Sequence, residues 1–114
     1  MPTRYYIRLP DPATARGDDA DLGFRSNAAE GFAEELQQAL RTSTLFERWS
    51  AKQSDPDDVD PALGATDPGA QVLGHQNDLH VELEVVTHLP SALLRQRMAL
   101  LAGHGWQLRD VAAA

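Results

Sequence analysis

The chain has 114 residues, 42% of them hydrophobic, and its 17 acidic residues against 10 basic ones give a formal net charge of −7. This length and hydrophobic content predict one folded domain over residues 1–114, while the negative charge argues against a nucleic-acid-binding surface, which is normally basic. The absence of cysteine excludes disulfides, thiolate metal sites and cysteine nucleophiles.

The first predicted element is a strand over residues 5–9, which ends at Pro10. Successive side chains of a strand point to opposite sides of the sheet, so its apolar residues share one buried side. The opposite side carries Arg4, Tyr6 and Arg8. Residues 11–25 contain four aspartates, two glycines and a proline without clear periodicity, and they predict an acidic loop.

A helix is predicted over residues 27–42, because Phe32, Leu36 and Leu40 repeat at the spacing of one helix face. Asn27 and Glu30 resemble a capping box at the start of this helix. The next segment, residues 45–52, is interpreted as a strand, although the side that it turns to the core stays open because Glu47 falls among the apolar positions.

Residues 54–78 hold six aspartates, three prolines and three glycines. We expect a long, acidic, partly mobile connection there, with a short hairpin extension near its end. Residues 79–88 predict the clearest strand of the chain, whose core-facing residues are Leu79, Val81, Leu83 and Val85. A second helix follows, with Pro90 in its first turn and Gly103 at its end, and a last strand covers residues 106–111.

The predicted order of elements is β-α-β-β-α-β, which resembles the ferredoxin-like sandwich. The resemblance is one of fold and implies no function, because this fold carries many. Right-handed crossovers imply a four-stranded antiparallel sheet in the order 4-1-3-2, with two helices on one face. The core is predicted to include Phe32, Leu36, Val81, Leu83 and Trp106.

The sheet face without helices collects the candidate functional residues. They are Arg4, Tyr6, Arg8, His80, Glu82, Glu84, His88 and Arg109. Two interpretations stay open for them. They form either a solvated ladder of ion pairs, which stabilises a sheet by roughly 0.2–1 kcal/mol per pair, or an interaction surface.

Several specific chemistries are disfavoured. RNA-recognition domains of this topology stack bases on aromatic residues of the central strands, where Glu82 and Glu84 would repel phosphate. His80 and these two glutamates, with His75 or His88, are possible metal ligands without a diagnostic spacing. The acidic run at 55–60 does not match a calcium-binding EF-hand loop. We predict no metal and no cofactor, and we find no motif of a catalytic nucleophile or a phosphate-binding loop.

The favoured function is a non-enzymatic domain that binds a protein. The partner is either a second copy of the chain, or a basic protein that an acidic inhibitor or immunity-type protein would mask. The alternative is a dimeric α+β barrel, whether an enzyme or a small-molecule binder, that encloses an organic substrate or haem. Its candidate residues are Arg4, Tyr6, His80 and His88. No apolar run resembles a signal peptide or a membrane span, so we expect a cytoplasmic protein without a membrane partner.

The negative charge is concentrated in the two predicted loops. Residues 11–25 and 54–78 hold ten of the 17 acidic residues and only two of the basic ones, which gives them a net charge of −8. The remaining framework therefore carries a net charge of +1. Any long-range electrostatic effect of this protein is expected to come from the loops.

Overall fold

The computed structural model describes residues 2–114, which form an α+β fold with a four-stranded antiparallel sheet and three α-helices. The strands are β1 (Thr3–Leu9), β2 (Gln71–Asn77), β3 (His80–Thr87) and β4 (Gln107–Ala113). The α-helices are α1 (Ala29–Arg41), α2 (Thr44–Ala51) and α3 (Ser91–Ala102). Short 3₁₀ helices interrupt the loops at Pro12–Thr14, Pro56–Asp58 and Pro61–Gly64.

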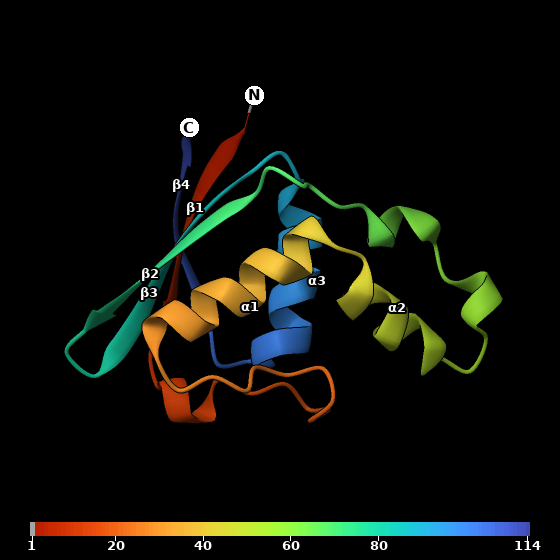
Figure 1. Cartoon of the computed structure of the whole chain (residues 1–114), viewed down its shortest axis with the longest axis horizontal. Helices are drawn as coiled ribbons and strands as arrows, with labels where there is room; N and C mark the ends of the chain where they lie inside the picture. Colours follow the sequence, from red (N-terminus) through yellow and green to blue (C-terminus); the bar gives the residue numbers. More distant parts are fainter. Residues whose placement is uncertain (1) are drawn as a thin grey trace.

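The sheet has the order β2-β3-β1-β4, and every neighbouring pair of strands is antiparallel. Helices α1 and α3 pack on one side of it (Figure 1). Read from the β4 edge, this order is the predicted 4-1-3-2. The second strand, however, is residues 71–77 and not the predicted residues 45–52. With the additional helix α2, the order of elements becomes β-α-α-β-β-α-β and departs from the predicted β-α-β-β-α-β.

The predicted strand at residues 45–52 is wrong, because this segment forms helix α2. Its apolar residues Leu45, Phe46 and Trp49 are spaced for one side of a helix, and the rings of Phe46 and Trp49 lie 6.0 Å apart, one helical turn from each other. The Ser43 hydroxyl donates to the Glu47 carboxylate at 3.1 Å at the start of the helix. In a strand, Glu47 would fall on the same side as Leu45 and Trp49. This conflict indicates that the apolar residues follow the period of a helix.

The predicted connection over residues 54–78 is also corrected, since Gln71–Asn77 near its end form the full edge strand β2. Asp78 adopts a left-handed conformation with φ of 59° and turns the chain directly from β2 into β3. Leu79 lies in this turn and is 82% exposed, although alternation predicted it to face the core. Leu79 is one of the two residues that form the turn, so the alternation of buried and outward-facing side chains in β3 begins only at His80.

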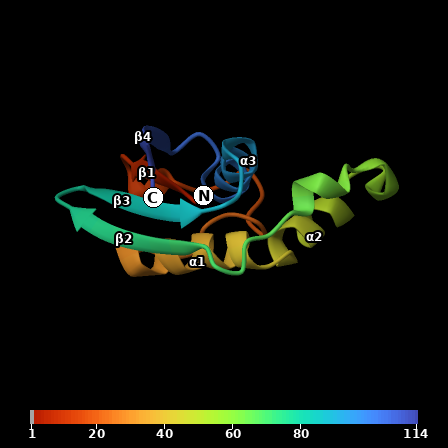
Figure 2. The same cartoon turned by 90° about the horizontal axis from the view of Figure 1, so that it is seen from above.

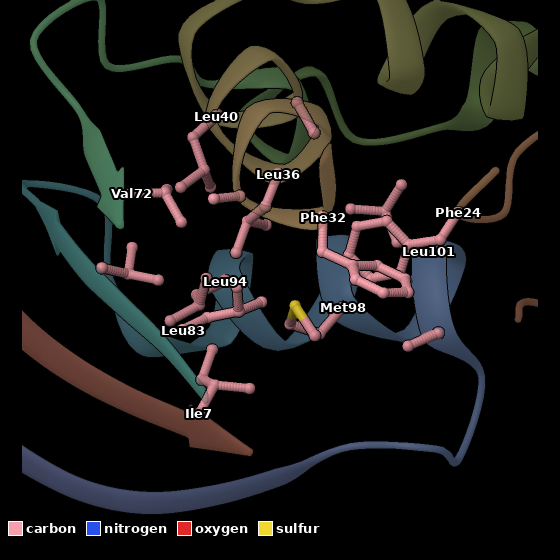
Figure 3. Close-up of a cluster of buried hydrophobic side chains, with 14 of the residues drawn as sticks. Ile7, Phe24, Phe32, Leu36, Leu40, Val72, Leu83, Leu94, Met98 and Leu101 are labelled. Atoms are coloured by element: carbon pink, nitrogen blue, oxygen red, sulfur yellow. The ribbon is translucent and has the colours of Figure 1, made fainter. Parts of the chain in front are cut away.

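The core lies between the sheet and helices α1 and α3, where Figure 3 shows leucines from both helices meeting strand residues. Phe32, Leu36, Val81 and Leu83 are all buried, as predicted. Trp106 is only partly buried and packs at the border of the core, with its indole N–H donating to the Gly103 carbonyl at 3.1 Å. It precedes β4, so it does not share the regular alternation of that strand.

Gly74 allows α1 to pack closely on β2. A Cβ atom at this position would lie 2.2 Å from the carbonyl oxygen of Ala29, so only glycine fits without moving the helix. The predicted capping box at the start of α1 is wrong. Ala28 occupies the N-cap position without a side-chain hydrogen bond, and the Asn27 amide oxygen accepts from the Arg16 guanidinium at 3.1 Å instead.

A buried carboxylate fixes the loop that leads into β2. The Asp67 side chain accepts hydrogen bonds from the Thr87 hydroxyl at 2.8 Å, from the His88 N–H at 2.9 Å and from the Gly69 N–H at 3.0 Å. Burial by itself would raise the pKa of Asp67, but these donors outweigh burial and hold the pKa below its ordinary value. The carboxylate therefore joins this loop to the end of β3.

Arg97 of α3 is fully buried without a carboxylate partner among residues 2–114. Its guanidinium donates to the Ala39 carbonyl at 3.3 Å, the Ala65 carbonyl at 3.0 Å and the Gln96 side chain at 2.8 Å. Burial lowers the pKa of Arg97. The residue ties the end of α1 and the segment before β2 to α3.

Helix α2 and the two 3₁₀ helices after it extend away from the sheet (Figure 2). This projecting arm, residues 44–66, includes the exposed aspartates of the predicted acidic connection, Asp55, Asp57, Asp58 and Asp60. Within residues 2–114, every helix is too short or too polar to traverse a lipid bilayer.

Candidate functional site

The side of the sheet opposite α1 and α3 carries most of the predicted functional residues, and we call it the open face. On β1 and β3, Tyr6 lies opposite Glu84 and Arg8 lies opposite Glu82. On β2, His75 is also opposite Glu82. The other open-face residues of these strands and of β4 are Arg4, Gln71, Leu73, Asn77, His80, Val86, Gln107, Asp110 and Ala112.

Ion pairs connect the two central strands across this face. The Arg8 Nη2 donates to the Glu82 Oε1 at 3.1 Å, and the same oxygen lies 3.3 Å from the His80 Nε2. The hydrogen bond from Arg8 holds the pKa of Glu82 below its ordinary value, with a further contribution from His80. These contacts confirm that the predicted residues of β1 and β3 pair across the sheet.

The pairing leaves two arginine donors unused. The Arg4 Nε lies 3.2 Å from the Glu84 Oε1, but its N–H is not directed at that oxygen. Both this atom and the Arg8 Nε are shielded from solvent and have no hydrogen-bond acceptor within residues 2–114. A buried N–H without an acceptor is costly, so these two arginines stabilise the sheet less than fully hydrogen-bonded arginines would.

A hollow of about 220 Å³ lies over the middle of the open face. Side chains from all four strands surround it: Tyr6, Arg8, His75, Glu82, Glu84 and Arg109. Ile7 and Leu83 also line it, and since their side chains are buried on the helix side, their backbone forms the floor. Five of the eight predicted site residues therefore converge on one concave surface.

Arg109 reaches the hollow from an irregular position in β4. Tyr6 pairs with Asp110 and Ile7 pairs with Leu108, which leaves Arg109 as an extra residue without a partner on β1. Such a β-bulge redirects a side chain and is frequent beside functional sites. The Arg109 side chain makes no ion pair with any of the other described residues.

His88 is wrongly placed in the predicted site. Strand β3 ends at Thr87, and His88 follows it at an exposed position where its backbone N–H donates to Asp67. Asp67 fixes the chain there and ends the strand one residue before the alternation would return to the open face. His88 therefore belongs to the loop contact and not to the hollow.

His75 is the residue of the hollow that sequence reasoning did not place there. The sequence pattern predicts it only as a possible metal ligand in the connection over residues 54–78, whereas it lies on β2 beside Glu82. The signal for this strand was present in the alternation of Val72 and Gly74 with outward residues. Asp78, a residue type that favours turns, just before the next strand gave a second signal.

A larger cavity of about 300 Å³ lies between α1 and α2. It is lined by Glu34, Glu35 and Arg48 among others, but Glu35 already accepts hydrogen bonds from the backbone N–H groups of Arg25 and Ser26. Glu35 is thus used in holding the preceding loop to α1. The open-face hollow is the better candidate, because its donors converge and are not all satisfied.

Metal binding finds no support in the arrangement of ligand-type side chains. Across the described part of the chain, no three His, Asp or Glu side chains are grouped so that they could hold a metal ion. Glu82 and Glu84 are each held by an arginine instead.

Comparisons with protein-family models, with curated proteins and with solved structures find no match for this chain.

Proposed function

We propose that this protein is a non-enzymatic assembly domain, a variant of the ferredoxin-like sandwich with one inserted helix, that self-associates through its open face. The observation that carries the proposal is the charge balance of this face. It holds three arginines and three carboxylates, in a chain whose net charge is −7. These residues are Arg4, Arg8, Arg109, Glu82, Glu84 and Asp110.

Charge balance favours this face as a contact between two copies. Copies of an acidic protein repel each other, and the repulsion is weakest where neutral faces with both signs of charge approach. A two-fold axis brings the same surface of each copy together, so that surface must complement itself. Alternating arginines and glutamates satisfy this condition, and the exposed Leu73 adds apolar area at the β2 edge.

The size of the open face sets the expected strength of the dimer. A seven-residue strand is about 23 Å long, and four strands spaced about 4.8 Å apart span about 19 Å. The face therefore offers roughly 440 Å² per copy, compared with about 800 Å² per partner in a stable complex of standard size. We expect a weak, reversible dimer that is populated at tens to hundreds of micromolar protein.

A glutamate at Leu73 tests this proposal. Leu73→Glu places an additional negative charge at an exposed position of the open face, and we expect it to abolish dimer formation. The matched control is Val111→Glu, because Val111 is 50% exposed and Leu73 is 58% exposed. Val111 pairs with the buried Tyr5 and so lies on the helix side of the other edge strand.

Light scattering coupled to size exclusion gives the measurement. The wild-type mass should rise with concentration from 12.5 kDa toward twice that value, Leu73→Glu should stay at the monomer mass, and Val111→Glu should follow the wild type. A wild-type mass that stays at 12.5 kDa at several hundred micromolar contradicts self-association. An equal loss in both variants contradicts the assignment to the open face.

A second candidate function, small-molecule binding, is favoured by the hollow of about 220 Å³ on the same face. Binding sites are concave surfaces with a few convergent polar groups, and this hollow has that form. Its small volume restricts the ligand to a compact molecule.

A further inference from the structure

We infer that the hollow of the open face binds a small organic carboxylate, with Arg109 as the principal carboxylate-binding residue. This inference names the ligand class for the second candidate function and does not require self-association.

The charges around the hollow favour an anion. Glu82 is neutralised by Arg8 and Glu84 lies beside Arg4, so the two carboxylates already have cationic neighbours. Arg109 is the cation of the hollow without an ion-pair partner among residues 2–114. The residues lining the hollow include two arginines and two glutamates, and Arg109 is the charged group among them without an ion pair, so an anion would find its partner there.

The available donors favour a carboxylate. A guanidinium binds a carboxylate through two parallel hydrogen bonds, and Arg109 has all its donors free of ion pairs. Arg8 also lines the hollow, but its Nε is shielded from solvent and its Nη2 already donates to Glu82, so Arg109 would make the carboxylate contact.

The shape of the hollow indicates a compact organic body. The bulge in β4 places Arg109 at one side of it, and Tyr6 and His75 supply ring side chains from other strands. About 220 Å³ is below the volume of sites for drug-sized ligands. Together these features fit a single small ring or short chain that carries one carboxylate.

Titration with benzoate, followed in amide NMR spectra, tests the inference. We expect saturable shifts of amides around Tyr6, Arg8 and Glu82 in the millimolar range. Benzamide, the neutral analogue, should bind at least about tenfold more weakly, because it lacks the charge that the arginines recognise. Arg109→Gln should weaken benzoate binding by a similar factor and leave the remaining spectrum unchanged, because Arg109 is exposed.

Arg95→Gln is the matched control, since it removes an exposed arginine from α3 and should bind benzoate like the wild type. The inference is overturned if benzoate produces no saturable shifts, if benzamide binds equally well, or if Arg109→Gln binds like the wild type. The mass of each sample is measured by light scattering under the same conditions. If the protein is monomeric and binds benzoate, only the proposed self-association is contradicted. If it is dimeric and does not bind benzoate, only this inference is contradicted.

Discussion

Phe32→Ala is expected to lower the free energy of unfolding by about 3–5 kcal/mol, the usual cost of truncating a fully buried phenylalanine. Phe32 is 0% exposed and joins α1 to the loop before it, because its ring meets the edge of the Phe24 ring at a centroid distance of 5.0 Å. The Arg16 guanidinium lies 5.4 Å from the centre of the same ring. Figure 3 shows the ring among Phe24, Met98 and Leu101.

Urea denaturation measures this loss. Domains of this size have total stabilities of about 5–15 kcal/mol, so the transition midpoint should fall strongly at an unchanged slope. Phe46→Ala is the matched control, because Phe46 is only half-buried on α2 and should cost about 1 kcal/mol. Equal losses for the two variants would contradict the position of Phe32 at the centre of the core.

Asp67→Ala is expected to cost about 3 kcal/mol, because it removes an ionised acceptor from three donors. Hydrogen bonds to charged groups contribute about 1.5–3 kcal/mol each, and bonds to one carboxylate do not add fully. The Thr87 hydroxyl is 2.8 Å from the carboxylate and buried, so it is the donor with least access to water. Asp58→Ala, at an exposed aspartate of the projecting arm, is the control and should leave the midpoint unchanged. A small effect of Asp67→Ala would show that water replaces the carboxylate.

The same carboxylate predicts a loss of stability in acid. Because the folded-state pKa of Asp67 is lowered, its contribution is complete above the unfolded-state pKa of about 3.9 and is lost as the pH falls through the lower folded value. Asp67→Asn cannot ionise, so its stability should fall less steeply than that of the wild type below about pH 4. Parallel curves of unfolding free energy against pH for the two proteins would contradict this role of Asp67.

The two errors in the predicted elements have one physical origin. Both concern short segments, α2 and β2, whose apolar residues are few, so that local periodicity competes with the contacts of the rest of the chain. The apolar residues of 45–52 have the spacing of a helix, and the position of Glu47 among them in a strand already indicated this. Residues 71–77 become a strand because β3 supplies a complete edge for pairing and Gly74 fits against α1.

The candidate site was predicted in its residue types but not in its shape. Alternation in two strands was enough to bring Tyr6, Arg8, Glu82 and Glu84 to one face, and the ion pairs there followed from their charges. The concavity was not predictable, because it depends on the edge strand β2 and on the bulge that turns Arg109 toward the centre. A β-bulge inserts one extra residue into a strand, here Arg109 in β4, and so changes the direction of a side chain. The hydrophobic pattern of the sequence does not show such an insertion.

The sequence by itself determined the central pair of strands, the two helices that cover them and the arginines and glutamates that those two strands place on the open face. These features depend on periodicity within long segments, which local side-chain chemistry specifies. Tertiary structure alone decided which segment completes the sheet, where β3 ends and which arginine lacks a partner. Those outcomes depend on contacts between residues distant in the chain, such as Asp67 with Thr87 and Gly74 with Ala29. Within a chain of net charge −7, the tertiary structure also balances the charges of the open face, because the bulge in β4 places Asp110 on it, and the proposed self-association rests on that balance.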